Sequence, residues 1–175
     1  RLRGDLVDYY PIDEEQTRLV AAYTDSVAEV MLEAAARAID DLRPASLAYS
    51  EGTSTFAVNR RENTEDEVVR MREAGQALKG VVDHYVPVLT VHGEKDELRA
   101  VLFGYACHPT TLSFTQWCGD YPGFAQIDIE QNHPGTTAMF FNACGADQNP
   151  IPRRTVELCR KYGGMLARSV EEVLA

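Results

Sequence analysis

Three loops of this chain hold side chains that could do chemistry, and each borders an apolar or helical segment. His108 follows one apolar run, Asp120 stands just before a predicted helix, and the polar residues 147–149 follow a second apolar run. In α/β proteins, the loops that follow strand ends are where ligands and catalytic groups gather. The spacing therefore predicts a polar site assembled from more than one loop.

His108 has the widest chemistry of these residues. An imidazole at the end of a strand can bind a metal ion or act as a general base, and it can equally hydrogen-bond within a strand-to-loop turn. A metal centre needs further ligands, and the chain has no His-x-His pair and no H-E-x-x-H motif to supply them locally. Taken alone, His108 leaves these interpretations open.

The acidic and amide side chains also have two interpretations each. Asp120 can cap the helix predicted for residues 121–132, or it can contact a ligand. Asp147, Gln148 and Asn149 lie in a loop that is followed by two nearby prolines. There they can orient a substrate, or they can hydrogen-bond the loop to itself.

No nucleophile stands out in the sequence. The chain has no G-x-S-x-G, no P-loop and no G-x-G-x-x-G motif. Cys107 is adjacent to His108, but neighbouring side chains of a strand point to opposite faces, so adjacency does not pair them. Cys107 and Cys144 each end an apolar run and are interpreted as small buried residues. A hydrolase that uses one of these cysteines is the least favoured alternative.

Eight periodic segments must position these loops. Apolar residues at steps of three and four predict helices, and alternating or continuous apolar runs predict strands. The predicted helices cover 14–42, 65–78, 121–132 and 155–174, and the predicted strands cover 45–50, 85–91, 98–106 and 136–143. This interleaved order is typical of an α/β layered domain with a mixed β-sheet flanked by helices. We expect a single domain over residues 1–175.

A hairpin is predicted in the middle of the chain. The turn at 93–97 separates the strands 85–91 and 98–106 by a few polar residues. Pro87 has no N–H to donate to a ladder, so it indicates that its strand lies at a sheet edge or carries a bulge.

A parallel pair of strands would bring the chemical residues together. The strand that ends before His108 and the strand 136–143 are separated by enough chain for a helical crossover, which predicts parallel neighbours. Parallel neighbours end at the same sheet edge. We therefore expect His108, Asp120 and Asp147 to converge at that edge.

The charge composition of the chain limits the kinds of partner that it is expected to bind. The chain carries 27 acidic and 17 basic side chains, a formal net charge of −10. Binding nucleic acid through its phosphates, or binding an anionic membrane surface, requires a basic face, so neither is an expected partner. The sequence has no apolar run of about 18 residues and predicts no transmembrane segment.

The same loop residues resemble the N-terminal catalytic domain of the neutral/alkaline non-lysosomal ceramidase family. The similar segments are Val86–Leu89, Ala106–Thr111, Gly119–Ala125 and Cys144–Pro150, with weaker similarity at Val58–Arg61. The histidine before Pro-Thr-Thr and the later Gly-Asp are specific only in combination. Including the long first helix, the resemblance covers nearly the whole chain.

This resemblance implies a zinc amidohydrolase, in which one metal ion held by three histidines, a glutamate and a tyrosine serves to cleave an N-acyl amide. His108 matches one of the family's histidine ligands. The family's other ligands would lie outside residues 1–175, so the chain would be an incomplete piece of the catalytic domain, completed by other segments of the parent protein. The resemblance also implies a soluble protein, secreted or periplasmic, that acts on a small-molecule or lipid amide.

Site roles follow from the same resemblance. We expect Asp147 and Asn149 to be catalytic, and we expect substrate contacts from Asn59, Arg60, Asp120 and Gln148.

One position departs from the family's pattern. Where ceramidases have a catalytically important serine, this chain has Gln148, which cannot be a nucleophile. This difference argues against ceramide itself as the substrate. Metal-dependent hydrolysis of another amide remains the expected activity. It also motivates an alternative: a non-catalytic binding or structural module that keeps the fold without the chemistry.

Overall fold

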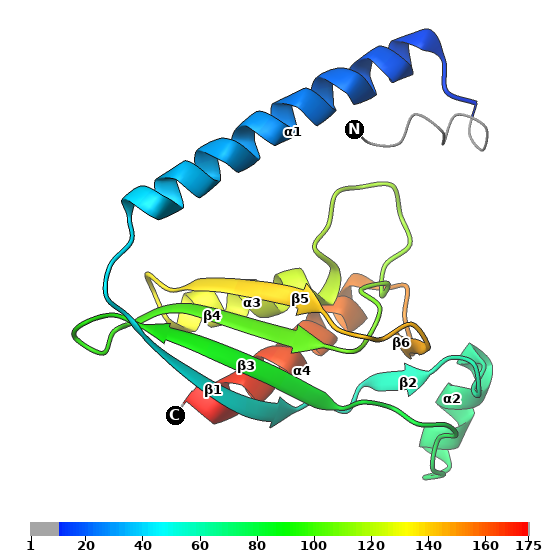
Figure 1. Ribbon diagram of the computed structural model, residues 1–175. Helices are drawn as coiled ribbons and strands as arrows, with labels where there is room; N and C mark the ends of the chain where they lie inside the picture. The colour runs from blue at the N-terminus through cyan, green and yellow to red at the C-terminus, as the bar shows by residue number, and fades with distance from the viewer. Residues whose placement is uncertain (1–10, 175) are drawn as a thin grey trace. The chain divides into compact units, whose positions relative to one another are not determined.

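The computed structural model of the chain describes residues 11–174 and divides the chain into two compact units, Arg1–Pro44 and Ala45–Ala175 (Figure 1). No helix of the described residues is long and apolar enough to cross a membrane.

The first unit holds the helix α1, Glu14–Asp40. A capping box starts it: the Asp13 carboxylate accepts from the Gln16 N–H at 2.7 Å, and the Gln16 side chain accepts from the Asp13 N–H at 3.2 Å. Acidic residues in the first turn and Arg37 in the last turn complement the helix dipole. The predicted helix is confirmed, and it ends two residues before the predicted boundary.

The second unit is built on a mixed sheet of four strands in the order β1-β3-β4-β5. The strands are β1 Ser46–Thr53, β3 Tyr85–His92, β4 Leu98–Tyr105 and β5 Thr137–Asn142. β3 pairs antiparallel with β1 and with β4, which confirms the hairpin. β4 pairs parallel with β5, and the helix α3, Asp120–Asn132, lies between them in the chain. The α/β layered fold and the parallel pair are both confirmed.

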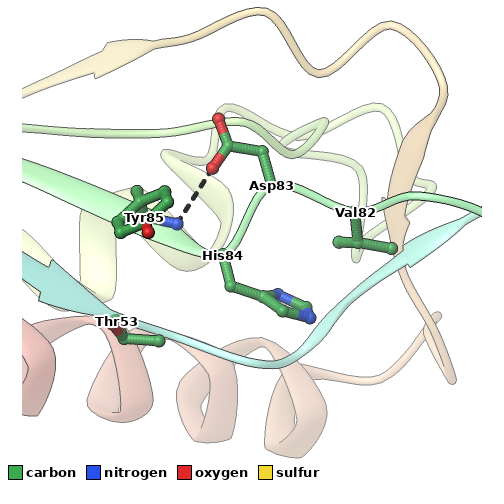
Figure 2. A pocket seen from close by; sticks show the side chains of 5 residues that line it. All are labelled: Thr53, Val82, Asp83, His84 and Tyr85. Carbon is green, nitrogen blue, oxygen red and sulfur yellow. Dashed lines mark hydrogen bonds between the residues drawn. The ribbon is translucent and has the colours of Figure 1, made fainter.

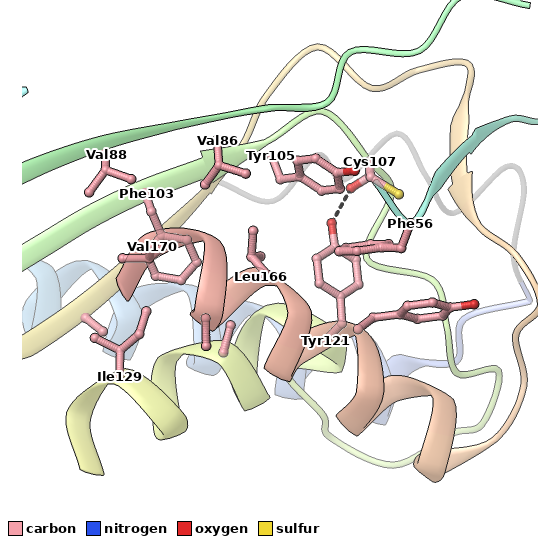
Figure 3. Packing of buried hydrophobic residues seen from close by; sticks show 14 of the residues in the cluster. Phe56, Val86, Val88, Phe103, Tyr105, Cys107, Tyr121, Ile129, Leu166 and Val170 are labelled. Carbon is pink, nitrogen blue, oxygen red and sulfur yellow. Dashed lines mark hydrogen bonds between the residues drawn. The ribbon is translucent and has the colours of Figure 1, made fainter. Parts of the chain in front are cut away.

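The helices α3 and α4, Val156–Leu174, cover one face of this sheet (Figure 1). Alternate residues of the strands point into the core between sheet and helices, because strand side chains alternate between faces. Tyr121 lies in this core and its hydroxyl donates to the Cys107 carbonyl at 2.6 Å (Figure 3). The main buried residues are Phe56, Val86, Val88, Val101, Phe103, Tyr105, Cys107, Tyr121, Ile129, Leu166 and Val170.

The opposite face of the sheet is apolar and open within the second unit. Leu47 and Tyr49 on β1 are 66% and 61% exposed, and Met139 and Phe141 on β5 are 43% and 41% exposed. Half of the residues in the predicted strand 136–143 are therefore exposed. The reason is that β5 is an edge strand with helices on one face only.

Of the two alternatives predicted for the strand that holds Pro87, the edge position is wrong because β3 is an inner strand, whereas β3 does carry a register shift. β3 lies between β1 and β4, but its pairing with β4 begins only at Val88. The missing N–H of Pro87 therefore costs no bond to β4. The irregularity of the β3–β4 ladder falls between Val91 and His92, away from the proline.

A second, smaller sheet was not predicted. β2 Ala57–Asn59 pairs antiparallel with β6 Gln148–Pro150, and both strands are too short for a periodic pattern to identify them. The helix α2, Glu65–Glu73, follows β2 and ends five residues before the predicted boundary. Gly75 lies just beyond its end with φ +65, a conformation that terminates helices.

Candidate functional site

The β2–β6 ladder and the end of β4 bring three distant segments together. The backbone N–H of Arg60 donates to the Asp147 carbonyl at 2.8 Å, and the backbone N–H of His108 donates to the Gln148 carbonyl at 2.9 Å. Asn59 pairs with Gln148 in the ladder itself. Five residues predicted for the site therefore lie side by side, and backbone hydrogen bonds fix their positions. They are Asn59, Arg60, His108, Asp147 and Gln148.

Gly145 sets how closely the loop after β5 approaches the end of β4. A Cβ atom at Gly145 would lie 2.4 Å from the Ala106 carbonyl carbon and 2.5 Å from the Cys107 nitrogen. Any side chain would push residues 145–149 away from His108. Glycine is required here because of the close contact between two backbones.

His108 is half-buried, with Nε2 3.3 Å from the Ala146 carbonyl oxygen. A carbonyl only accepts, so Nε2 donates and carries the proton. In the neutral ring this leaves the lone pair on Nδ1, the nitrogen available to a metal ion or a proton. Metal-binding histidines typically donate their other ring N–H to such an acceptor.

The Ala146 carbonyl accepts from Arg60 as well. Nε and Nη2 of the Arg60 guanidinium lie 3.2 and 3.0 Å from this oxygen. A cation and an imidazole thus share one backbone acceptor. Arg60 is exposed, so its positive charge borders solvent beside His108.

Asn59 is 6% exposed and has partners for both ends of its amide. Nδ2 donates to the Asp147 carboxylate at 3.1 Å and to the Val81 carbonyl at 3.0 Å. Oδ1 accepts from the backbone N–H groups of Arg61 and Glu62 at 3.0 and 3.3 Å. Its contacts tie together three chain segments and position Asp147.

Gln148 and Asn149 are both buried but differ in their partners. The Gln148 side chain accepts from the backbone N–H of Asp83 at 3.1 Å. The Asn149 side chain is 5% exposed, and its Oδ1 has no hydrogen-bond partner among the described residues. A buried acceptor without a partner is costly to keep, which makes Asn149 a candidate for binding a ligand.

Asp120 is not the N-cap of α3, which was one of its two predicted interpretations. The N-cap residue is Gly119, and Asp120 is the first residue of the helix, with φ +50. Its carboxylate accepts from the N–H groups of Tyr121 at 2.7 Å, Thr111 at 3.1 Å and Leu112 at 2.9 Å. These bonds hold the loop that follows His108. His108 thus lies beside the segment 146–148, and Asp120 holds residues 111 and 112 of the loop that follows His108.

The cysteines have different environments. Cys107 is fully buried, and burial raises the pKa of its thiol far above the usual range. A thiol held protonated is a poor nucleophile, so this residue gives no support to a cysteine-based hydrolase. Cys144 is exposed, and the prediction that it is buried is wrong because β5 ends at Asn142 and Cys144 lies in the loop beyond it.

A cavity of about 310 Å³ adjoins the site through Asp83 (Figure 2). The Asp83 N–H is held by Gln148, and the Asp83 carboxylate accepts from the Tyr85 N–H at 3.0 Å. His84 also lines the cavity, and its Nδ1 is buried with no hydrogen-bond partner in residues 11–174. No periodic pattern or motif in the sequence marks His84 as a functional residue. The lining residues are Thr53, Val82, Asp83, His84 and Tyr85.

Among the described residues, no group of three histidine, cysteine or acidic side chains is placed to hold one metal ion. His108 can supply a single imidazole. These residues therefore do not form a complete metal centre by themselves.

Comparisons with known proteins concern the fold. No family model and no curated protein matches the chain. Among solved structures, the chain is similar to a ceramidase complexed with C2, at 18% identity and a TM-score of 0.62, over 79% of this chain and 23% of that chain. It is also similar to neutral ceramidase from Pseudomonas aeruginosa, at 17% identity and a TM-score of 0.66, over 86% of this chain and 26% of that one.

At this identity the likeness concerns the fold alone, and it confirms the resemblance to a portion of the ceramidase fold. The chain spans about a quarter of the length of each ceramidase.

Proposed function

We propose that this chain is part of a ceramidase-like, metal-dependent hydrolase of amide bonds, with zinc as the metal. The observation that carries the proposal is the geometry of His108, placed on a ceramidase-like fold. Its Nε2 is turned to the Ala146 carbonyl, which leaves Nδ1 as the donor for a metal ion. When bound, zinc would polarise an amide carbonyl and activate water.

The roles of the other residues follow from their partners. Asp147 is held by Asn59, and Asn149 keeps an unpaired buried oxygen, so these two are proposed as the catalytic polar groups. Arg60 and Asn59 position the loop that carries them and border the substrate. Asp120 and Gln148, proposed as substrate contacts from the sequence, have carboxylate and amide oxygens that already accept backbone N–H groups. Both are better supported as positioning residues.

The remaining metal ligands are proposed to come from other segments of the parent protein. The likeness covers only about a quarter of each ceramidase, which leaves most of such a domain outside this chain. The substrate is proposed to be a small-molecule or lipid amide other than ceramide, because Gln148 offers no nucleophilic hydroxyl. A soluble protein, secreted or periplasmic, is proposed from the same resemblance.

A second candidate is a non-catalytic binding module. The observation that favours it is the buried Gln148 side chain, whose bond to Asp83 ties two loops together. In that case the fold would be retained and the position of the family's serine would serve stability.

The test is zinc content and amide hydrolysis in the parent protein, with and without His108→Ala. We expect the variant to lose its bound zinc and its activity. His92→Gln is the control, because His92 lies in the β3–β4 hairpin and its Nε2 is paired with Thr90 at 3.1 Å. Unchanged zinc in His108→Ala would remove the assignment. A parent protein that binds no zinc and cleaves no amide would favour the binding module.

A further inference from the structure

A second cavity lies beside the loop that follows His108. It encloses about 220 Å³ and is lined by Thr110, Leu112, Ser113, Arg153 and Arg154. Two hydroxyl side chains and two guanidinium groups thus meet at one hollow in a chain whose net charge is −10. The two arginines directly precede α4 in the chain.

The two arginines share one carboxylate. Nε of Arg153 donates to Glu65 at 2.6 Å, and Nη1 and Nη2 of Arg154 donate to it at 2.8 and 3.1 Å. Two positive charges are therefore balanced by one negative charge, which leaves the cavity wall with a surplus of one. Nη1 of Arg153 and Nε of Arg154 make no hydrogen bond to any described residue.

Arg154 is held in a strained backbone conformation. Its φ is +88, in the region that favours glycine and that other residues rarely adopt. Its backbone N–H donates to the Thr111 carbonyl, which ties it to the loop that carries Thr110 and Ser113. Non-glycine residues keep such conformations where the surrounding structure enforces them, and they cluster at active sites and ligand clamps.

We propose that this cavity binds an oxyanion, either a carboxylate or a phosphate group. A guanidinium presents N–H groups in a planar fork that fits both. The hydroxyls of Thr110 and Ser113 can donate to the same group, since a hydroxyl both donates and accepts. This proposal does not depend on whether the chain hydrolyses an amide, because none of the residues that line the cavity is proposed to hold the metal.

The experiment titrates the chain with sodium phosphate and, separately, with sodium acetate, at constant ionic strength set by sodium chloride. Backbone amide shifts of Thr110, Ser113 and Arg154 report binding. We expect saturable shifts with at least one anion. Saturation by phosphate alone identifies a phosphate site, by acetate alone a carboxylate site, and by both a general oxyanion site.

Three variants test whether the charges at the cavity determine the affinity for the anion. Arg154→Gly removes one guanidinium and suits the positive φ, so we expect binding about tenfold weaker without loss of the fold. Glu65→Gln removes the balancing charge, so we expect tighter binding. Arg70→Gln removes an exposed positive charge of α2 that does not line the cavity, and we expect its affinity for the anion to equal that of the unaltered chain. Urea unfolding checks that each variant is folded.

The proposal is overturned if neither anion saturates, or if folded Arg154→Gly binds as the unaltered chain does. It is also overturned if Glu65→Gln binds no more tightly, because the arginines would then serve only to cross-link α2 to the segment before α4.

Discussion

Two asparagines that the sequence predicts in the same site differ in their hydrogen bonds. Asn59 has partners for Nδ2 and Oδ1 in three chain segments, whereas Oδ1 of Asn149 has none among the described residues. Both side chains are nearly fully buried. Burial alone therefore does not distinguish a residue that holds the fold from one that is kept for a ligand.

We expect Asn59→Ala to lower the free energy of unfolding by about 2–3 kcal/mol, because it leaves several buried groups without partners. Asn149→Ala should change it by less than about 1 kcal/mol, because an unpaired oxygen is removed. Urea unfolding of the two variants measures the difference. An equally large loss in Asn149→Ala would mean that its amide supports the loop, and Asn149 would then lose its proposed role.

Glu65 gives the chain a defined dependence on pH. Burial by itself raises the pKa of this carboxyl, but the hydrogen bonds and charges of Arg153 and Arg154 together hold it below the ordinary value of 4.5. A carboxyl with a lowered folded-state pKa stabilises the fold above its unfolded-state pKa. This contribution is lost as the pH falls through the folded-state value.

We therefore expect Glu65→Gln to be less stable than the unaltered chain at neutral pH, and we expect the difference in stability to be smaller at about pH 3. Urea unfolding at both pH values gives the comparison. A stability gap that is the same at both would show that the carboxylate charge plays no part in holding the arginines.

At the scale of elements, the site depends on how closely the loop after β5 can approach the end of β4. Both strands end at the same edge, and the Ala143 N–H donates to the Tyr105 carbonyl at 3.1 Å. Gly145 then continues the contact where a side chain has no room. The helix α3 makes this possible, since it returns the chain to the same edge as a parallel crossover.

We expect Gly145→Ala to destabilise the chain by about 1–3 kcal/mol, because backbone atoms must move to admit the methyl group. The amide shift of His108 should change with it, because its bond to Gln148 spans this contact. Gly123→Ala is the control: nothing lies within 4 Å of its added Cβ, and alanine favours the helix by about 1 kcal/mol. An unaffected Gly145→Ala variant would mean that the loop is looser than the contact implies.

The second unit as a whole exposes one apolar face of its sheet. This face runs across four strands, from Leu47 and Tyr49 to Met139 and Phe141. Contiguous apolar surface of this kind binds hydrophobic dyes and promotes association, and exposed edge strands add to the tendency.

We expect the isolated chain to bind a hydrophobic fluorescent dye, and Leu47→Lys to reduce that binding with little effect on the free energy of unfolding. Val156→Lys, at a 42% exposed residue at the start of α4, is the matched control and should leave dye binding unchanged. Equal reductions of dye binding in both variants would show that the added charge, rather than the open face, determines how much dye is bound.

The sequence was sufficient for the layered fold, the hairpin and the parallel crossover, because each depends on periodic patterns over many residues. The inward face of α4, with Tyr162, Leu166 and Val170 buried, also follows from its spacing. The small β2–β6 ladder could not be predicted, since three residues carry no measurable period. The sequence left Asp120 open between a helix cap and a ligand contact, because its bonds to the backbone N–H groups of Thr111 and Leu112 depend on how the preceding loop folds.

Residue types and spacing determined that His108 and Asp147 would share a sheet edge, because parallel strands joined by a crossover end together. Only the tertiary structure decided what each side chain does there. The Ala146 carbonyl, unmarked in the sequence, selects the proton-bearing nitrogen of His108. The pairing of Glu65 with two arginines about ninety residues away likewise depends on long-range packing. Contacts between side chains distant in sequence leave no periodic trace, so their partners are fixed only when the chain folds.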